Sequence, residues 1–103
     1  MTRGEVLAWL EARRPTPPDA LRACLEITVS DAEPSSLLPL PDHLAQLGRR
    51  LLAWVACRPE GGRELARELL AADAFITYAF EAQAEVDAAG LAALAERIAE
   101  SEP

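Results

Sequence analysis

The stretch from about residue 62 to residue 86 constrains the fold more than any other part of the chain. Its residues fall into a heptad seam with alternating spacings of four and three, the pattern of a helix that packs against other helices. The seam runs through Leu65, Leu69, Ala72, Ile76, Ala79, Gln83 and Val86. A second apolar line runs through Ala66, Leu70, Phe80 and Ala84. A helix that is apolar on more than one face is buried on more than one side, so we expect a long helix at the centre of the protein.

The length of this helix predicts contact with a second chain. At about 1.5 Å per residue, about 25 residues make a helix roughly 38 Å long, whereas a compact domain of about 100 residues is roughly 33 Å across. An unbroken helix would therefore extend beyond its own domain. Either the helix breaks, or a second copy of the chain covers the excess. We favour a homodimer with the seam as its interface, because symmetric dimers are the commonest oligomers.

Composition predicts an all-α protein. Ala and Leu supply 37 of the 103 residues and both favour helices, whereas the β-branched residues that favour strands are scarce. The length suits a single domain over residues 1–103. These features predict a small bundle of four to five helices, with the long helix fourth in the chain. The absence of Lys and Asn fits either a GC-rich genome or a thermophilic host.

Capping and proline signals place two helices in the first third of the chain. Thr2 and Glu5 have the spacing of a capping box, which predicts the start of the first helix. This helix should end at Arg14, because the following proline disfavours helical backbone at the residue before it. Thr16 fits the N-cap of the second helix and Pro17 its first helical position. The second helix should continue to about residue 30.

Residues 31–41 are expected to form an extended connection rich in proline and leucine. The prolines stiffen the backbone, and the leucines Leu37, Leu38 and Leu40 make the segment apolar. Two interpretations remain open. The segment either lies as a strap across the core of its own domain, or it is exposed and docks on a partner.

Two further helices flank the long one. The third should run from Pro41 or Asp42 to about Arg58, and Gly48 within it permits a close helix crossing. Its expected buried face consists of Leu44, Leu47, Leu51, Trp54 and Val55. A break is expected at residues 59–62. A turn or kink at residues 87–90 should lead into a short last helix, and residues 101–103 should be disordered.

A faint internal repeat suggests two related αα-hairpins. The segments Leu-Ala-Trp-Leu at residues 7–10 and Leu-Ala-Trp-Val at residues 52–55 match at an offset of 45 residues, and an Arg-Pro pair follows each. The chain could therefore consist of a duplicated hairpin followed by the last helix. The alternative is coincidence in a chain rich in Ala, Leu and Arg.

The charge distribution excludes several classes of partner. The net charge is −7, and all of the excess lies in residues 59–103. An acidic chain without Lys is poorly suited to nucleic acid or to anionic membranes, and Arg49 and Arg50 form only a small basic spot. No apolar run reaches the roughly 20 residues that a membrane span requires. The start of the chain does not resemble a signal peptide, so we expect a cytoplasmic protein.

The sequence offers little for catalysis, and we predict a protein that is not an enzyme and needs neither metal nor cofactor. His43 is the single histidine, lies in the first turn of the third helix, and is expected to be solvated. Cys24 and Cys57 are expected to pack as small apolar residues, because their spacing suits neither a disulfide framework nor a metal site. The chain has no glycine-rich phosphate loop, nucleophile-elbow serine or Glu-x-x-His motif.

Asp73 is the most informative polar residue, because it interrupts the most apolar stretch of the chain. Tyr78 and Glu81 follow on the same helix, so these three residues could line a polar pocket for a small ligand or a cation. The alternative is a solvated stripe or a structural ion pair with Arg49, Arg50 or Arg67.

The sequence therefore predicts a helical module that acts through protein contacts and self-associates through the fourth helix. The apolar seam, the leucine-rich connection and the missing catalytic groups favour this hypothesis. The arginines of the first half could also meet the acidic second half across a subunit boundary. The second hypothesis is a bundle that binds a small ligand or a cation around Asp73, Tyr78 and Glu81.

Overall fold

The computed structural model describes residues 2–32, 37–58 and 62–100 of the 103-residue chain. Five α-helices account for most of these residues, which confirms the prediction of a small all-α bundle. The elements are α1 (Arg3–Glu11), α2 (Asp19–Asp31), α3 (Leu40–Ala56), α4 (Arg63–Val86), the short 3₁₀ helix η1 (Ala88–Gly90) and α5 (Leu91–Glu100).

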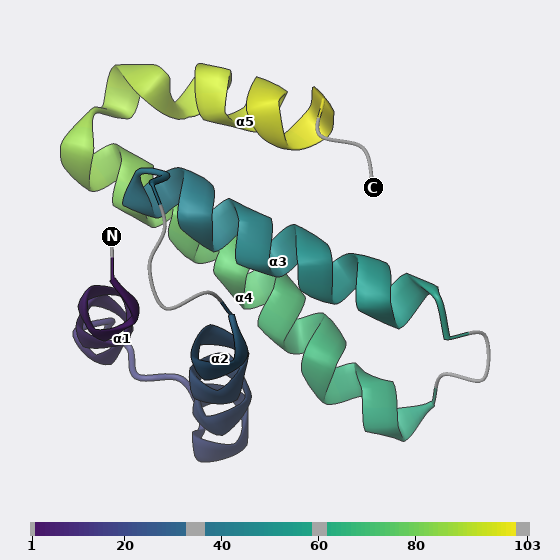
Figure 1. Ribbon diagram of the computed structural model, residues 1–103. Helices are drawn as coiled ribbons and strands as arrows, with labels where there is room; N and C mark the ends of the chain where they lie inside the picture. The colour runs from purple at the N-terminus through teal and green to yellow at the C-terminus, as the bar shows by residue number, and fades with distance from the viewer. Residues whose placement is uncertain (1, 33–36, 59–61, 101–103) are drawn as a thin grey trace.

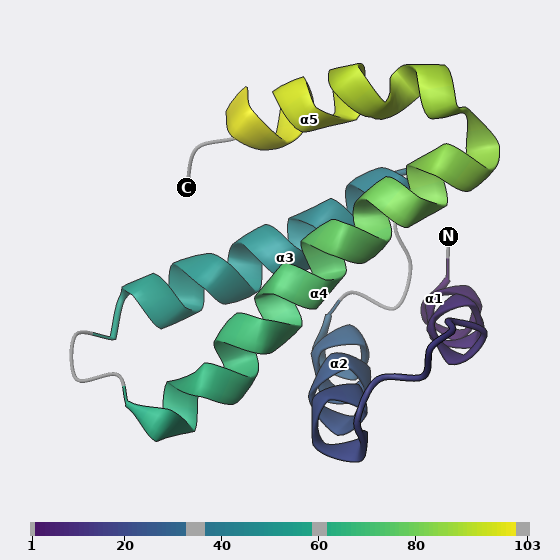
Figure 2. The ribbon, with the colours of Figure 1, turned by 180° about the vertical axis from the view of Figure 1, so that it is seen from behind.

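The antiparallel pair of α3 and α4 forms the long axis of the molecule, whose extents are 39 × 29 × 26 Å (Figure 1). The small helices α1 and α2 lie on one side of this pair, and α5 folds back along the other side, as the view from behind also shows (Figure 2). The fourth helix is continuous from Arg63 to Val86, so the alternative in which it breaks is wrong.

Gly48 marks the close crossing that the sequence predicts between α3 and α4. A Cβ atom built on Gly48 would lie 3.0 Å from the carbonyl oxygen of Ala72 and 3.0 Å from Cδ1 of Ile76. A larger residue would have to push the two helices apart, because the nearest obstacle is backbone. Glycine at this position therefore permits the short distance between α3 and α4, the helix pair against which the other helices pack.

The core lies where α4 meets the other helices, but not along the predicted seam. Among the described side chains of α4, the buried ones are Ala71, Ala72, Phe75, Ala79 and Ala82. Only Ala72 and Ala79 belong to the predicted seam. The buried face differs from the predicted seam because the heptad rule favours large aliphatic residues at the buried positions. On α4, small alanines allow the neighbouring helices to pack closely, and the single large side chain of Phe75 fills the centre of the core. The other fully buried large side chains are Val6, Leu25, Val29, Leu44 and Leu94.

The first two turns of α4 are poorly covered by the rest of the chain. None of the described side chains at residues 63–70 is buried, and all five buried positions of α4 come later. On α3 the same trend appears, because Leu44 and Leu47 are buried while Trp54, expected on the buried face, is exposed. The connected ends of α3 and α4 thus extend beyond the helices that pack on them (Figure 1).

The capping predictions succeed at α1 and fail at α2. Thr2 is the N-cap of α1, and Thr2 and Glu5 exchange the two hydrogen bonds of a capping box. The helix ends at Glu11, one turn before the expected stop at Arg14. At α2 the N-cap is Pro18 rather than Thr16. Two consecutive prolines explain the difference, because a residue that precedes proline is excluded from helical backbone and the helix cannot begin until both have passed.

Helices occupy both ends of the expected connection at residues 31–41, since α2 continues to Asp31 and α3 begins at Leu40. Between them, residues 33–36 lie outside the described part of the chain. Leu37 is fully exposed, whereas Leu40 packs against the core. Leu40 thus fits a segment that packs on its own core, and Leu37 fits a segment that is free to contact a partner. The expected break at residues 59–61 and the tail at residues 101–103 also lie outside the described residues.

The proposed repeat has a matching local geometry. Arg13 stacks over the ring of Trp9 at 3.6 Å, and Arg58 stacks over the ring of Trp54 at 3.5 Å. In each pair the arginine also donates a hydrogen bond to the backbone oxygen of the tryptophan. Duplication of a hairpin remains a prediction, because α1 and α2 are much shorter than α3 and α4.

Candidate functional site

The three candidate ligand residues do not form one site. Asp73 is exposed and makes no hydrogen bond or ion pair with any residue that the structure describes, so it belongs to a solvated stripe. In particular, Arg49 donates its hydrogen bond to the backbone oxygen of Ile98 instead. Tyr78 lies elsewhere because five residues correspond to a rotation of about 140° around a helix. Tyr78 and Glu81 do come together, but against α1.

An aromatic and charged cluster joins α4 to α1 at this point. The ring of Trp9 packs edge-on against Tyr78, with 5.9 Å between the ring centroids. The Trp9 indole Nε1 donates to Glu85 Oε1 at 3.0 Å, and Arg13 donates to Glu85 Oε2 at 2.9 Å. Arg13 also lies 3.8 Å from Glu81.

Within this cluster, Glu85 accepts hydrogen bonds from both Trp9 and Arg13. Hydrogen bonds from Arg13 and then from Trp9 lower the pKa of Glu85, and burial raises the pKa of Tyr78. A carboxylate and an arginine that are already paired offer little to a ligand. We therefore assign the cluster a structural role, namely to fasten α1 to the C-terminal half of α4.

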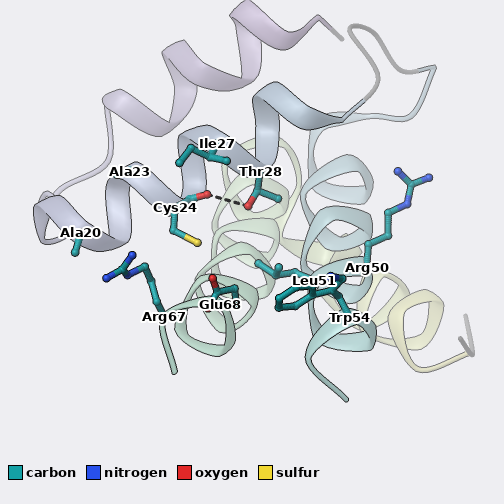
Figure 3. Close-up of a pocket in the computed structure, with 10 residues that line it drawn as sticks. All are labelled: Ala20, Ala23, Cys24, Ile27, Thr28, Arg50, Leu51, Trp54, Arg67 and Glu68. Atoms are coloured by element: carbon teal, nitrogen blue, oxygen red, sulfur yellow. Dashed lines mark hydrogen bonds between the residues drawn. The ribbon is translucent and has the colours of Figure 1, made fainter. Parts of the chain in front are cut away.

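A pocket of about 390 Å³ lies between α2, α3 and α4 (Figure 3). Its walls are largely apolar and include two arginines, which lie at opposite sides of the pocket (Figure 3). The lining residues are Ala20, Ala23, Cys24, Ile27, Thr28, Arg50, Leu51, Trp54, Arg67 and Glu68. The pocket exists because α2 crosses the α3–α4 pair with small residues facing it, so that Ala20, Ala23 and Cys24 leave space that larger side chains would fill.

Glu68 is the unusual residue of this pocket. Its Oε2 atom is buried and has no hydrogen-bond partner among the described residues. Cys24 lies beside it, where burial raises the pKa of the thiol and the Glu68 carboxylate raises it further. Thr28 lies one turn along and donates its hydroxyl hydrogen bond to the backbone oxygen of Cys24 at 2.8 Å (Figure 3).

The two arginines that line the pocket, Arg50 and Arg67, are exposed to solvent. Sequence reasoning missed Glu68 altogether. A signal was available, because Glu68 precedes the buried residues Ala71, Ala72 and Phe75 by three, four and seven positions and so shares their face of the helix.

His43 is buried, with 6% of its surface exposed, so the expectation of a solvated histidine is wrong. Its Nδ1 atom has no hydrogen-bond partner in the described part of the chain. Burial lowers the pKa of His43, and the nearby charge of Arg50 lowers it further, which favours the neutral imidazole. The position in the first turn of α3 suggested exposure, but α3 turns this side inward.

Large apolar side chains are exposed near the connected ends of α3 and α4. Leu52 is 47% exposed, Leu69 49% and Leu70 59%; we call these three residues the tip surface. Arg49 of α3 donates a hydrogen bond to the backbone oxygen of Ile98 in the last turn of α5, and Leu52 lies about one turn further along α3. Gly48 of α3 contacts Ala72 of α4 at the crossing. The two helices are antiparallel, so Leu52, one turn after Gly48, and Leu69, one turn before Ala72, lie on the same side of the crossing, toward the connected ends.

The predicted interface seam divides into buried and accessible positions. Ala72 and Ala79 are buried within the chain itself, so a second copy would have to contact α4 elsewhere. Leu65, Ile76 and Gln83 are half-buried. Leu69 and Val86 are exposed, at opposite ends of the helix. Of the seam, Leu69 alone belongs to the tip surface.

Residues 2–32, 37–58 and 62–100 contain no group of three or more His, Cys, Asp or Glu side chains that could hold a metal ion. Within the same residues, no helix is long and apolar enough to cross a membrane. Comparisons with family models, with curated proteins and with solved structures find no match. The fold defines the protein as a small all-α bundle, with five α-helices in the part of the chain that the structure describes. Its function has to be argued from its surfaces.

Proposed function

We propose that this protein is a non-enzymatic helical module that self-associates through the tip surface. The observation that carries the proposal is the exposure of three large aliphatic side chains, Leu52, Leu69 and Leu70, in the half of the α3–α4 pair that is nearer to its connected ends. Several large apolar side chains exposed in one region mark an interaction site more often than an isolated exposed leucine does. A second copy of the chain is the simplest occupant, because an apolar surface is complementary to itself across a two-fold axis.

The charged contacts of the protein support an interface that is mainly apolar. Of the arginines that could meet the acidic half across a subunit boundary, Arg49 donates a hydrogen bond to the backbone oxygen of Ile98 in α5, and Arg58 donates one to the backbone oxygen of Trp54 in its own helix. A second contact between α3 and α5 is the ion pair of Asp42 with Arg97, at 2.7 Å. These contacts fix α5 over the first half of α3 and leave the tip surface to apolar association.

The proposal includes neither nucleic acid nor membrane as a partner. A net charge of −7 disfavours binding to either kind of anionic surface. We also propose a cytoplasmic location, which the two free cysteines support because thiols persist in reducing compartments.

Substitution of the tip surface by charge tests the proposal. We expect Leu52→Glu and Leu69→Glu each to convert an associating protein to a monomer, because a buried unpaired carboxylate costs several kcal/mol. Val86→Glu is the matched control, since Val86 is also apolar, is 77% exposed and lies at the other end of α4. Light scattering after gel filtration gives the mass of each variant. If Val86→Glu dissociates the protein and the tip variants do not, the interface lies elsewhere.

Ligand binding is the second candidate function, and the pocket between α2, α3 and α4 supports it better than the residues predicted from the sequence do. The polar residues Asp73, Tyr78 and Glu81 do not enclose a cavity together, whereas the space between α2, α3 and α4 does have the size of a ligand site. Substitution of the seam residues Ile76 or Ala79 by glutamate would test neither self-association nor ligand binding, because these residues pack in or against the core.

A further inference from the structure

We propose that the pocket between α2, α3 and α4 binds a small molecule that carries a protonated amine on an apolar body. This binding site is separate from the tip surface, and it can be present whether or not the protein self-associates. The argument rests on the shape of the pocket, on the unpaired oxygen of Glu68 and on the two arginines that line it.

The shape and the walls select a compact apolar ligand. A volume of about 390 Å³ falls at the small end of the roughly 300–1,000 Å³ that ligand sites occupy. Ile27, Leu51 and Trp54 come from two different helices and give the pocket a wall that aliphatic or aromatic groups can contact (Figure 3). Ala20 and Ala23, on the same helix as Ile27, add only small side chains to this wall.

Glu68 selects the polar group of the ligand. A buried carboxylate oxygen without a partner is unfavourable, because it has lost water and gained no donor in return. The neighbouring thiol of Cys24 stays protonated and is a weak donor. A protonated amine supplies up to three strong donors together with the opposite charge. Because Oε2 is closed off from solvent, the Glu68 carboxylate has to rotate toward the pocket to accept this charge-assisted hydrogen bond.

The arginines of the pocket allow one further feature of the ligand. Arg50 and Arg67 line the pocket and are exposed, and neither is bonded to Oε2 of Glu68. A carboxylate beside the amine could reach one of these guanidinium groups. A simple apolar amine and an apolar α-amino acid therefore share the chemistry that Glu68 selects, and they differ only in whether an arginine adds to it.

Three probes of one shape separate these cases. 2-Phenylethylamine carries only the amine, phenylalanine carries amine and carboxylate, and 3-phenylpropanoate carries only the carboxylate. Calorimetric titration of the full chain measures the affinity of each. We expect the amine and the amino acid to bind and 3-phenylpropanoate to bind at least tenfold more weakly. Tighter binding of phenylalanine than of the amine identifies an amino acid as the ligand class, and equal affinities identify a simple amine.

Substitution of Glu68 tests the role of its carboxylate. We expect Glu68→Gln to weaken binding of 2-phenylethylamine roughly tenfold or more, the usual effect of losing a charged hydrogen bond. Asp73→Asn is the matched control, because Asp73 is an exposed acid on the same helix and should leave the affinity unchanged. The mass of Glu68→Gln in solution should equal that of the wild type, which separates this proposal from self-association.

A labelling experiment on the unaltered protein keeps the test decisive if Glu68→Gln fails to fold. 2-Phenylethylamine should slow alkylation of Cys24, which lines the pocket, and leave alkylation of the exposed Cys57 unchanged. Binding of 3-phenylpropanoate as tight as that of the amine would overturn the proposal. So would an amine that binds Glu68→Gln as well as the wild type, or one that gives no protection of Cys24.

Discussion

The close approach of α3 and α4 at Gly48 leads to a quantitative prediction about stability. Alanine at this position would place its Cβ atom 3.0 Å from the backbone oxygen of Ala72 and from Cδ1 of Ile76. Ordinary carbon contacts are about 3.5–4.0 Å, so either the crossing widens or Ile76 changes its rotamer. We expect overpacking to cost about 1–3 kcal/mol, and the better helix propensity of alanine to return about 1 kcal/mol.

The net effect expected for Gly48→Ala is a loss of about 1 kcal/mol in the free energy of unfolding, or a fall of about 4–8 °C in Tm for a domain of this size. Gly4→Ala is the matched control. Gly4 also lies within a helix, but no atom lies within 4 Å of the position a Cβ atom would take. This second variant should gain about 0.5 kcal/mol from helix propensity alone.

Urea denaturation followed by circular dichroism measures both variants against the wild type. The reasoning requires the two substitutions to have opposite signs. If Gly48→Ala stabilises the protein as much as Gly4→Ala does, the crossing is not as close as the structure has it. The positions of the pocket and of the tip surface would then be in doubt, because both are set by the same helix pair.

Three further predictions concern ionisable groups. The pKa of His43 lies below its ordinary value of 6.5 in the folded state. The unfolded chain therefore binds the proton first, and the free energy of unfolding should fall as the pH drops below about 6.5. Urea titrations from about pH 8 to about pH 5 should show a smaller fall for His43→Gln than for the wild type, and equal falls would refute the assignment. Glu85→Gln should lower the free energy of unfolding by less than about 1 kcal/mol, because the Arg13–Glu85 pair is partly exposed. High salt should abolish this difference from the wild type, and a loss that does not depend on salt would show that the pair does not stabilise the protein through its charges. Burial raises the pKa of the Cys24 thiol, so iodoacetamide should alkylate Cys57 first when peptides are followed by mass spectrometry; preferential labelling of Cys24 would contradict its burial.

The sequence predicts the helices well because their signals are local. The start of α1 follows from Thr2 and Glu5, and the bounds of α4 follow from its apolar periodicity and the breaks on either side. The close crossing at Gly48 was also predictable, since a glycine inside a good helix usually has a packing reason. Thr16 shows the limit of such rules, because two prolines in succession displace the start of α2 past the residue best suited to cap it.

Burial around each helix is harder to predict because it depends on which neighbours arrive and from where. A heptad seam assumes one partner, but α4 is flanked by α3 on one side and by α2 on another, so its buried face is centred on Phe75 and alanines. The same assumption concealed Glu68, which lies on that face. Asp73 attracted attention because its sequence neighbours are apolar, yet the helix turns it to solvent.

The mass of the wild-type protein in solution tests the central claim most directly. Light scattering after gel filtration, carried out over a hundredfold range of concentration, compares the measured mass with the 11.1 kDa of one chain. We expect the mass to rise towards twice this value with concentration, and Leu52→Glu to keep it at one chain throughout. A wild-type mass of one chain at every concentration would contradict self-association through the tip surface.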